Sequence, residues 1–215
     1  MNKKKGILIV LSGPSGTGKG TVGKGMRGKN KNVYFSVSAT TRKPRNNEVD
    51  GKDYYFMSRD EINDIIDSGN MLEHAQYCGN IYGTPKKAII DQLNKGKDVL
   101  LDIDVQGGAQ VKEKMPDCIS IFLLPPSLKV LEQRLRDRKT DSEENIKKRL
   151  KAAVKELDQV ENYDYLVVND DLDSCVDDIL HILNSEKLKT FRMIDILKGV
   201  VNNDDWTYYG RLKEK

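Results

Sequence analysis

Shortly after its start, the chain runs through Gly13-Pro14-Ser15-Gly16-Thr17-Gly18-Lys19-Gly20-Thr21. An apolar run, residues 6–11, comes directly before this glycine-rich loop, and a segment of helical period, residues 19–27, begins within it. Glycines let the backbone curl so that successive N–H groups point inward, and the start of a helix adds partial positive charge. Lys19 adds a mobile cation for the β- and γ-phosphates. The sequence therefore predicts a phosphate-binding loop of the P-loop type, with residues 13–21 around ATP.

The loop departs from the commonest form of this motif at one position. Lys19 is followed by Gly20 rather than by serine or threonine, so the hydroxyl that often binds magnesium moves to Thr21. We therefore do not expect Thr21 to be a firm magnesium ligand. The alternative is a glycine-rich turn that binds nothing. It is disfavoured because the strand, four glycines and the lysine occur together.

The rest of the chain alternates between short apolar runs and helical periods. The runs are too continuous for amphipathic surface strands and are typical of buried parallel strands. They cover residues 6–11, 33–38, 99–103, 119–124 and 165–168. The segments of helical period cover residues 19–27, 85–95, 128–138, 143–160 and 172–183. This alternation predicts an α/β fold with a five-stranded parallel sheet.

Two segments interrupt the alternation. Residues 38–84 mix aromatic and turn residues, and they contain one short helix that begins at the capping box Ser58 to Glu61. We predict a small, mainly antiparallel inserted subdomain there. Residues 127–156 are dense in charge and are predicted to form a helical lid, the alternative being a solvated helical hairpin. The predicted domain covers residues 1–185, with a core of about residues 1–37, 85–126 and 157–185, and a helical and polar extension covers residues 186–215.

The bulk composition disfavours several classes of protein. The 36 basic and 33 acidic side chains leave a net charge of +3, which is too small and too evenly spread for a nucleic-acid binder. The three cysteines form no C-x-x-C pair, so a reducing compartment fits best. No run approaches the roughly 18 apolar residues of a membrane span. We therefore expect a cytoplasmic protein.

The inserted segment carries a candidate phosphate clamp. Arg42 and Arg45 lie three residues apart around Pro44, and Tyr54 follows. Because the proline disfavours a helical conformation in the residue before it, this segment can aim both guanidinium groups at one anion. Taken alone, such an R-x-x-R cluster is more often surface charge.

Several segments together resemble the guanylate kinase family. They are Thr41-Arg42-Lys43-Pro44-Arg45 with Glu48, Gly51 and Tyr54; Glu73-His74-Ala75-Gln76; Gly79-Asn80-Ile81-Tyr82-Gly83-Thr84; Leu101-Asp102-Ile103-Asp104-Val105-Gln106-Gly107; and Val168-Asn169-Asp170-Asp171. The resemblance covers about residues 5–183. The chain departs from the family pattern at Asn47 and Lys139, where the family often has glycine. Asparagine tolerates a left-handed backbone, so we expect the turn at Asn47 to persist.

The resemblance implies ATP:GMP phosphotransfer, which also extends to dGMP and serves purine nucleotide metabolism. It places Arg42, Arg45, Tyr54 and Tyr82 on the GMP phosphate, and Ser38, Glu73, Thr84 and one or both of Asp102 and Asp104 near the base. The chemistry of guanine agrees, because its N1–H and N2–H donors suit a carboxylate such as Glu73, whereas adenine presents an unprotonated N1. An unmatched buried polar group costs about 1 to 3 kcal/mol. For Asp102 and Asp104 the alternative is a helix cap for the turn that follows.

The same resemblance assigns the ATP side. It implies that Arg134, Arg138 and Arg149 close over ATP, and that Asn169 contacts adenine, unless Asn169 only forms a strand-end turn. Arg134 and Arg138 lie four residues apart, on one helical face. The resemblance also implies Mg²⁺ as the cofactor, held mainly by phosphates and water near Thr21 and Asp102. Catalysis would then rest on Lys19, Arg42 and these lid arginines, because phosphoryl transfer depends on fixed cations.

Two other classes of protein remain as alternatives. One is a catalytically inert, guanylate-kinase-like interaction module, whose phosphate loop tends to be degraded, whereas Lys19 and the arginines are present here. The other is a nucleic-acid binder, which would need a basic stripe and an aromatic platform. The partners that we expect are ATP and GMP, with no nucleic acid and no membrane. The sequence leaves open whether the chain is a monomer or a homodimer, and what Trp206, Tyr208 and Tyr209 do.

Overall fold

The computed structural model describes residues 5–45, 48–77, 79–137 and 142–194. The chain divides into two compact units, residues 1–178 and 179–215, and the fold and site discussed below lie in the first. The strands are β1 (Leu8–Ser12), β2 (Val33–Phe35), β3 (Ala39–Thr40), β4 (Tyr55–Phe56), β5 (Met71–Tyr77), β6 (Asn80–Pro85), β7 (Asp98–Asp102), β8 (Ile119–Leu124) and β9 (Tyr165–Val168). The helices are α1 (Lys19–Lys29), α2 (Arg59–Asp67), α3 (Lys86–Asn94), α4 (Val105–Lys114), α5 (Leu128–Asp137), α6 (Glu143–Leu157), the 3₁₀ helix η1 (Val160–Asn162) and α7 (Leu172–Glu186).

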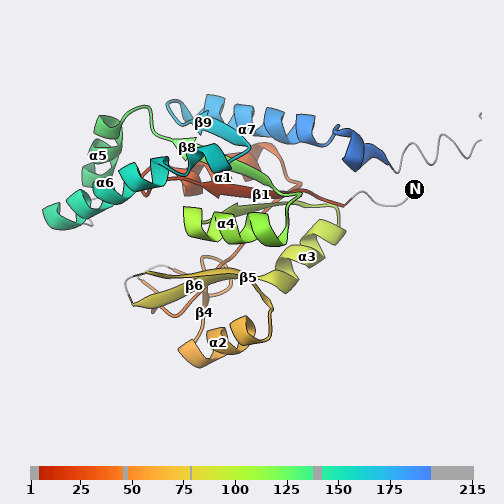
Figure 1. Cartoon of the computed structure of the whole chain (residues 1–215), viewed down its shortest axis with the longest axis horizontal. Helices are drawn as coiled ribbons and strands as arrows, with labels where there is room; N and C mark the ends of the chain where they lie inside the picture. Colours follow the sequence, from red (N-terminus) through yellow and green to blue (C-terminus); the bar gives the residue numbers. More distant parts are fainter. Residues whose placement is uncertain (1–4, 46–47, 78, 138–141, 195–215) are drawn as a thin grey trace, which may run out of the picture. The chain divides into compact units, whose positions relative to one another are not determined.

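The core sheet has five parallel strands in the order β2-β7-β1-β8-β9. All five residues of β1 are buried, because a central parallel strand has neighbours on both edges and helices against both faces. The carboxyl end of β1 leads directly into the glycine-rich loop and α1 (Figure 1). The predicted five-stranded parallel α/β core is confirmed.

Each of the five predicted helical segments is found within a few residues of its expected bounds, but the sequence reasoning missed α4. This helix contains Gly107 and Gly108, and glycine in a helix interior costs about 1 kcal/mol relative to alanine. Asp104 caps its first turn, with the Gly107 N–H donating to Asp104 Oδ1 at 2.8 Å. Both glycines are buried where other elements approach the helix closely.

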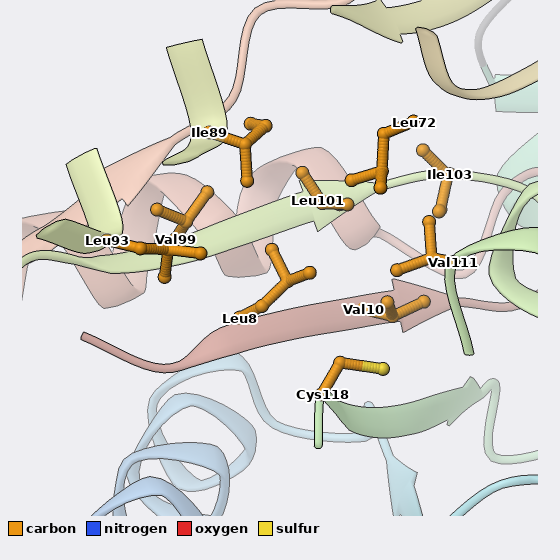
Figure 2. Close-up of a cluster of buried hydrophobic side chains, with 10 residues drawn as sticks. All are labelled: Leu8, Val10, Leu72, Ile89, Leu93, Val99, Leu101, Ile103, Val111 and Cys118. Atoms are coloured by element: carbon orange, nitrogen blue, oxygen red, sulfur yellow. The ribbon is translucent and has the colours of Figure 1, made fainter. Parts of the chain in front are cut away.

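One cluster of buried side chains joins the sheet to α3, α4 and the inserted segment (Figure 2). Its members from outside the core sheet include Leu72 of β5 and Val111 of α4, both fully buried. The full cluster is Leu8, Val10, Leu72, Ile89, Leu93, Val99, Leu101, Ile103, Val111 and Cys118. Strand β5 is therefore packed into the same core as β1 and β7.

The inserted segment forms a second sheet in the order β4-β3-β6-β5. Strand β6 pairs antiparallel with β3 and β5, while β3 and β4 are parallel, so the predicted mainly antiparallel character is confirmed. The predicted capping box is also present: Ser58 Oγ accepts from the Glu61 N–H at 3.2 Å, and Glu61 Oε2 accepts from the Ser58 N–H at 2.7 Å. A small apolar cluster of its own, including Ala39 and Ile62, stabilises this subdomain.

Helices α5 and α6 pack against each other through buried apolar side chains. Leu131 and Leu135 of α5 contact Ile146 and Ala153 of α6 in one cluster. A Cβ at Gly16 would lie 2.9 Å from Leu131 Cδ1, so α5 also packs against the phosphate loop. The pair is therefore more than a solvated hairpin. Across the described part of the chain, every helix is too short or too polar to cross a membrane.

Candidate active site

The glycine-rich loop has the backbone that its sequence predicts. Gly13, Gly16 and Gly18 have φ values of 147°, 102° and 95°, which L side chains rarely adopt. Thr17 is buried and closes the loop, since its N–H and its hydroxyl both donate to the Pro14 carbonyl, at 3.2 and 2.9 Å. The loop ends at Gly18, which precedes the first turn of α1. This conformation directs backbone N–H groups and the start of a helix toward one anion site.

Lys19 and Asp102 are brought together at this loop. The Lys19 ammonium donates to the Gly13 carbonyl at 2.6 Å, so it lies over the loop. Burial raises the pKa of Asp102, and the nearby Lys19 cation acts in the opposite direction. A Cβ at Gly20 would lie 3.6 Å from Asp102 Oδ2, so this carboxylate, at the carboxyl end of β7, borders the first turn of α1. Thr21 is exposed in the same turn.

Two of the three predicted lid arginines reach the phosphate loop or its border. Arg149 of α6 donates to Ser15 Oγ at 2.8 Å, a contact between residues 134 positions apart. Arg134 of α5 donates from Nη2 to the Asn169 carbonyl at 3.0 Å. Its Nη1 is buried and has no hydrogen-bond partner among the described residues, as expected for a donor that a ligand could satisfy. Arg138 and Lys139 lie outside the described residues.

Asn169 is buried and its side chain contacts the phosphate loop. Its Nδ2 donates to the Thr17 carbonyl at 2.7 Å, and a Cβ at Gly18 would lie 2.5 Å from the same atom. Its backbone N–H donates to the Leu124 carbonyl at the end of β8. At least one N–H of the Asn169 amide therefore supports the loop, so that donor is not available for the predicted contact with adenine.

The predicted acceptor-phosphate residues gather around the guanidinium of Arg42. Its carbon lies 5.4 Å from the centre of the Tyr54 ring and 5.8 Å from that of Phe56. The Tyr54 and Tyr82 rings meet edge to face with centroids 6.1 Å apart. Burial raises the pKa of Tyr54, and the nearby Asp102 charge adds to the effect, so this cluster faces the carboxyl end of the core sheet.

Arg42 is held by a carboxylate that sequence reasoning did not place in the site. Its Nη1 and Nη2 donate to Glu48 Oε2 and Oε1, each at 2.9 Å, in a bidentate pair. The Arg45 N–H donates to the same Glu48 Oε2 at 2.7 Å, and Arg42 holds the pKa of Glu48 below its usual range. The Arg45 side chain is exposed. The signal that could have identified Glu48 is its fixed place in the quoted motif. The predicted turn residue Asn47 lies outside the described residues.

The predicted base-reading residues Glu73 and Thr84 are cross-strand partners on β5 and β6. Thr84 Oγ1 donates to Glu73 Oε1 at 2.5 Å, and both side chains are buried. Burial raises the pKa of Glu73 to about 7, although the Thr84 hydrogen bond acts in the opposite direction. Ser38, directly before β3, is half-buried on the same small sheet. The carboxyl of Glu73, an ionisable hydrogen-bond acceptor, is thus buried beside the hydroxyl of Thr84.

Asp102 and Asp104 do not play the same structural role. Asp104 accepts the Gly107 N–H as the N-cap of α4, which is the alternative that the sequence left open, and its side chain is exposed. Its charge still helps to raise the pKa of Glu73. A Cβ at Gly107 would lie only 2.7 Å from Glu73 Oε2. Gly107 is therefore a site residue to which the sequence reasoning gave no role, although it lies in the quoted motif of residues 101–107.

The side chains near the phosphate loop limit how Mg²⁺ could be bound. Among the residues that the structure describes, no group of three or more His, Cys, Asp or Glu side chains could hold a metal ion. Mg²⁺ prefers oxygen ligands and commonly keeps several waters, binding through one or two carboxylates and substrate phosphates. The carboxylate of Asp102, at the end of β7 beside Gly20, is an oxygen donor of the kind that such an ion takes.

Two anion-binding regions thus meet the carboxyl end of one parallel sheet. One is the phosphate loop with Arg134 and Arg149, and the other is the Arg42 cluster with Glu73 beyond it. Ligands of open α/β sheets bind at this end of the strands. A P-loop together with a second polar site, which pairs a buried carboxyl with a hydroxyl, is typical of the class of P-loop nucleotide phosphotransferases.

Comparison with known proteins identifies the family within that class. The guanylate kinase family model matches residues 5–186. The guanylate kinase of Clostridium tetani is 50% identical over 192 residues, covering 89% of this chain and 92% of that protein, and the guanylate kinase of Lactobacillus acidophilus is 50% identical over 202 residues, covering 93% and 98%. The crystal structure of guanylate kinase from Anaplasma phagocytophilum superposes with a TM-score of 0.76 at 37% identity, covering 95% of this chain and 97% of that chain. The chain belongs to the guanylate kinase family.

Proposed function

We propose that this chain transfers the γ-phosphoryl group of ATP to GMP, giving ADP and GDP. The observation that carries the proposal is the buried pair of Glu73 and Thr84. An ionised Glu73 accepts the N1–H and N2–H donors of guanine. Adenine would set an unprotonated N1 against the carboxylate, at a cost of about 1 to 3 kcal/mol per unmatched buried group. The site therefore favours GMP over AMP, and dGMP shares the same base.

On the acceptor side, Arg42, Tyr54 and Tyr82 bind the phosphate of GMP, with Arg45 completing the clamp. Support comes from the gathering of the first three side chains in one cluster. Two guanidinium groups suit a phosphate because each offers parallel N–H donors. A GMP held between this cluster and Glu73 directs its phosphate toward the core sheet.

On the donor side, residues 13–21 bind the phosphates of ATP, and Arg134 and Arg149 close the site from α5 and α6. Two observations support these roles: Arg134 Nη1 is buried with no hydrogen-bond partner in the described part of the chain, and Arg149 contacts Ser15. We place Asn169 at the border of the adenine site, where its side chain also supports the loop. A closed site excludes water and so suppresses wasteful ATP hydrolysis.

In the transfer itself, an oxygen of the GMP phosphate attacks the γ-phosphorus, and the bond from that phosphorus to the β–γ bridging oxygen breaks. The protein has little covalent chemistry to perform, so fixed cations stabilise the moving charge. Lys19 lies over the loop, Arg149 contacts it through Ser15, and Arg134 lies at its border beside Asn169. Arg42 adds a cation from the acceptor side. When bound, Mg²⁺ neutralises phosphate charge, and Asp102 would hold it through oxygen or water.

The decisive assay is coupled detection of ADP release with GMP, dGMP, IMP, AMP and UMP as acceptors. GMP and dGMP are expected to be used best, followed by IMP, which lacks the 2-amino donor. Use of AMP but not GMP would overturn the proposal. Glu73→Gln is expected to weaken the use of GMP far more than the binding of ATP, and an equal loss of both would argue against base reading.

The alternative of an inert interaction module is disfavoured by the same residues. Lys19, Arg134 and Arg149 are present, and the phosphate loop keeps its positive-φ glycines. We place the reaction in the cytoplasm, where reduced thiols persist, because the three cysteines are widely separated in the sequence and form no C-x-x-C pair.

A further inference from the structure

The outer edge of strand β5 is bound by a side chain of α4. Strand β5 is the last strand of its sheet, so one row of its backbone groups faces away from β6. Gln110 Nε2 donates to the His74 carbonyl at 2.8 Å, and the His74 N–H donates to Gln110 Oε1 at 3.1 Å. The amide of Gln110 therefore makes the pair of hydrogen bonds that a neighbouring strand would make.

A second side chain of α4 binds β5 on the other side of Glu73. The Lys114 ammonium donates to the Leu72 carbonyl at 2.8 Å and lies 3.4 Å from the Met71 carbonyl. Gly107, Gln110 and Lys114 are spaced three and four residues apart, which places them on one face of the helix. The three consecutive residues 72–74 are thus held against that face, with Glu73 in the middle.

The helix that holds β5 is itself fixed to the core. Val111 of α4 packs with Leu72 of β5 in the cluster of Figure 2. Ser12, the last residue of β1, donates from Oγ to the Asp104 carbonyl at 3.3 Å, just before α4 begins. Figure 1 shows α4 between β1 and β5. The helix therefore connects the end of β1, where the phosphate loop starts, with the strand that carries Glu73.

We propose that Gln110 and Lys114 are positioning residues for guanine recognition, because they fix β5 and thereby the carboxylate of Glu73 relative to the phosphate loop. The proposal rests on the proposed ATP:GMP phosphotransfer and deepens it. Neither residue touches the nucleotide; both act through the backbone beside Glu73.

The contacts of β5 explain why this role is separable from stability. Strand β5 keeps its pairing with β6 and the buried side chain of Leu72 when either α4 contact is removed. What changes is the freedom of residues 72–74 to shift along the face of α4. A misplacement of 1 Å at a binding group can cost far more in function than in folding.

The test compares Gln110→Leu, which removes both hydrogen bonds at similar size, and Lys114→Met, which removes the ammonium but keeps the stem. The matched control is Glu113→Gln, an exposed position on the same helix. For each variant, kcat and KM for GMP, KM for ATP, the GMP-to-IMP ratio of kcat/KM and the melting temperature are measured. Both test variants are expected to raise KM for GMP about 5- to 30-fold. KM for ATP stays within twofold, the preference for GMP over IMP falls, and the control matches wild type.

The outcomes separate the two proposals. A wild-type chain that does not use GMP overturns the proposed function itself. Wild-type use of GMP, with unchanged KM and GMP-to-IMP ratio in both variants, overturns only the positioning role. An equal rise in KM for ATP and for GMP, in parallel with a fall in the melting temperature, also overturns only the positioning role. If Gln110→Leu fails to fold, Gln110→Glu and Lys114→Met decide. The Gln110→Glu side chain can still accept the His74 N–H but cannot donate to the His74 carbonyl when it is ionised. A rise in KM for GMP without a rise in KM for ATP is therefore expected.

Discussion

Acidification from pH 8 to pH 6 is expected to weaken GMP binding through Glu73. Burial raises the pKa of this carboxyl to about 7, with Asp104 adding to the rise and Thr84 and Lys114 opposing it. Only the ionised carboxylate can accept both guanine donors. With a pKa of about 7, the ionised share falls from about nine tenths at pH 8 to about one tenth at pH 6, so KM for GMP rises about 10-fold.

The assay must separate Glu73 from the phosphate of GMP, because a phosphate monoester also titrates, with a second pKa of about 6. KM for GMP is measured by coupled ADP release at saturating ATP, from pH 5.5 to 8.5 and at constant ionic strength. Glu73→Gln keeps the titration of the phosphate but loses that of the carboxyl. The ratio of wild-type to variant KM isolates Glu73 and is expected to rise about 10-fold toward pH 6. A constant ratio would refute the reasoning.

The same pKa predicts a pH dependence of stability. The pKa of Glu73 is about 7 in the folded chain against 4.5 for a free glutamate, so the folded chain binds an extra proton between these values. The free energy of unfolding therefore falls as the pH rises from about 4.5 to 7, by about 3 kcal/mol from this group, and the penalty is complete above pH 7. Glu73→Gln removes this term. In urea denaturation, the variant is expected to gain about 2.5 kcal/mol on wild type between pH 5 and pH 8, because part of the change has already occurred below pH 5.

Three further substitutions test neighbouring contacts. Gly107→Ala places a Cβ 2.7 Å from Glu73 Oε2 and should raise KM for GMP at least about 10-fold while sparing KM for ATP; unchanged kinetics would contradict the close approach. Gly28→Ala, in α1 with nothing within 4 Å of the new Cβ, should stabilise the chain by about 0.5 to 1 kcal/mol in urea denaturation and serves as the matched control. Glu48→Gln weakens the hold on Arg42 and should raise KM for GMP about 5- to 30-fold; a lower KM would show that Glu48 competes with the phosphate instead.

The core of the fold could be predicted because its central strands β1, β7 and β8 are almost entirely buried and read as continuous apolar runs. The edge strand β9 is partly exposed but is also a short apolar run, and β8 and β9 were predicted with their observed bounds. The helix α4 was missed because propensity opposes it at Gly107 and Gly108. The Asp104 cap offsets part of this cost, and tertiary contacts, which the local sequence does not encode, offset the rest.

The candidate site also contains features that the sequence could predict and features that it could not. The phosphate loop depends on local backbone conformation, so its glycines and Lys19 were sufficient to predict it. The pairing of Glu73 with Thr84 depends on the register of β5 and β6, which the motifs implied only through family resemblance. The role of Gln110 depends on contacts with a strand 36 residues away, which no sequence spacing indicates. The role of Glu48 is local, and only its place in the motif with Arg42 could have indicated it.

The two glycines of α4 show why a locally unfavourable sequence suits this site. Together they cost about 2 kcal/mol of helix propensity, which the Asp104 cap offsets in part. A Cβ at Gly107 would meet Glu73 Oε2 at 2.7 Å, and a Cβ at Gly108 would meet Tyr163 Oη at 2.8 Å and Ser12 Oγ at 3.0 Å. One glycine thus admits the carboxylate of Glu73, and the other admits the end of β1. Because neighbouring residues of one helix make both approaches, we infer that α4 sets the distance between Glu73 and the phosphate loop.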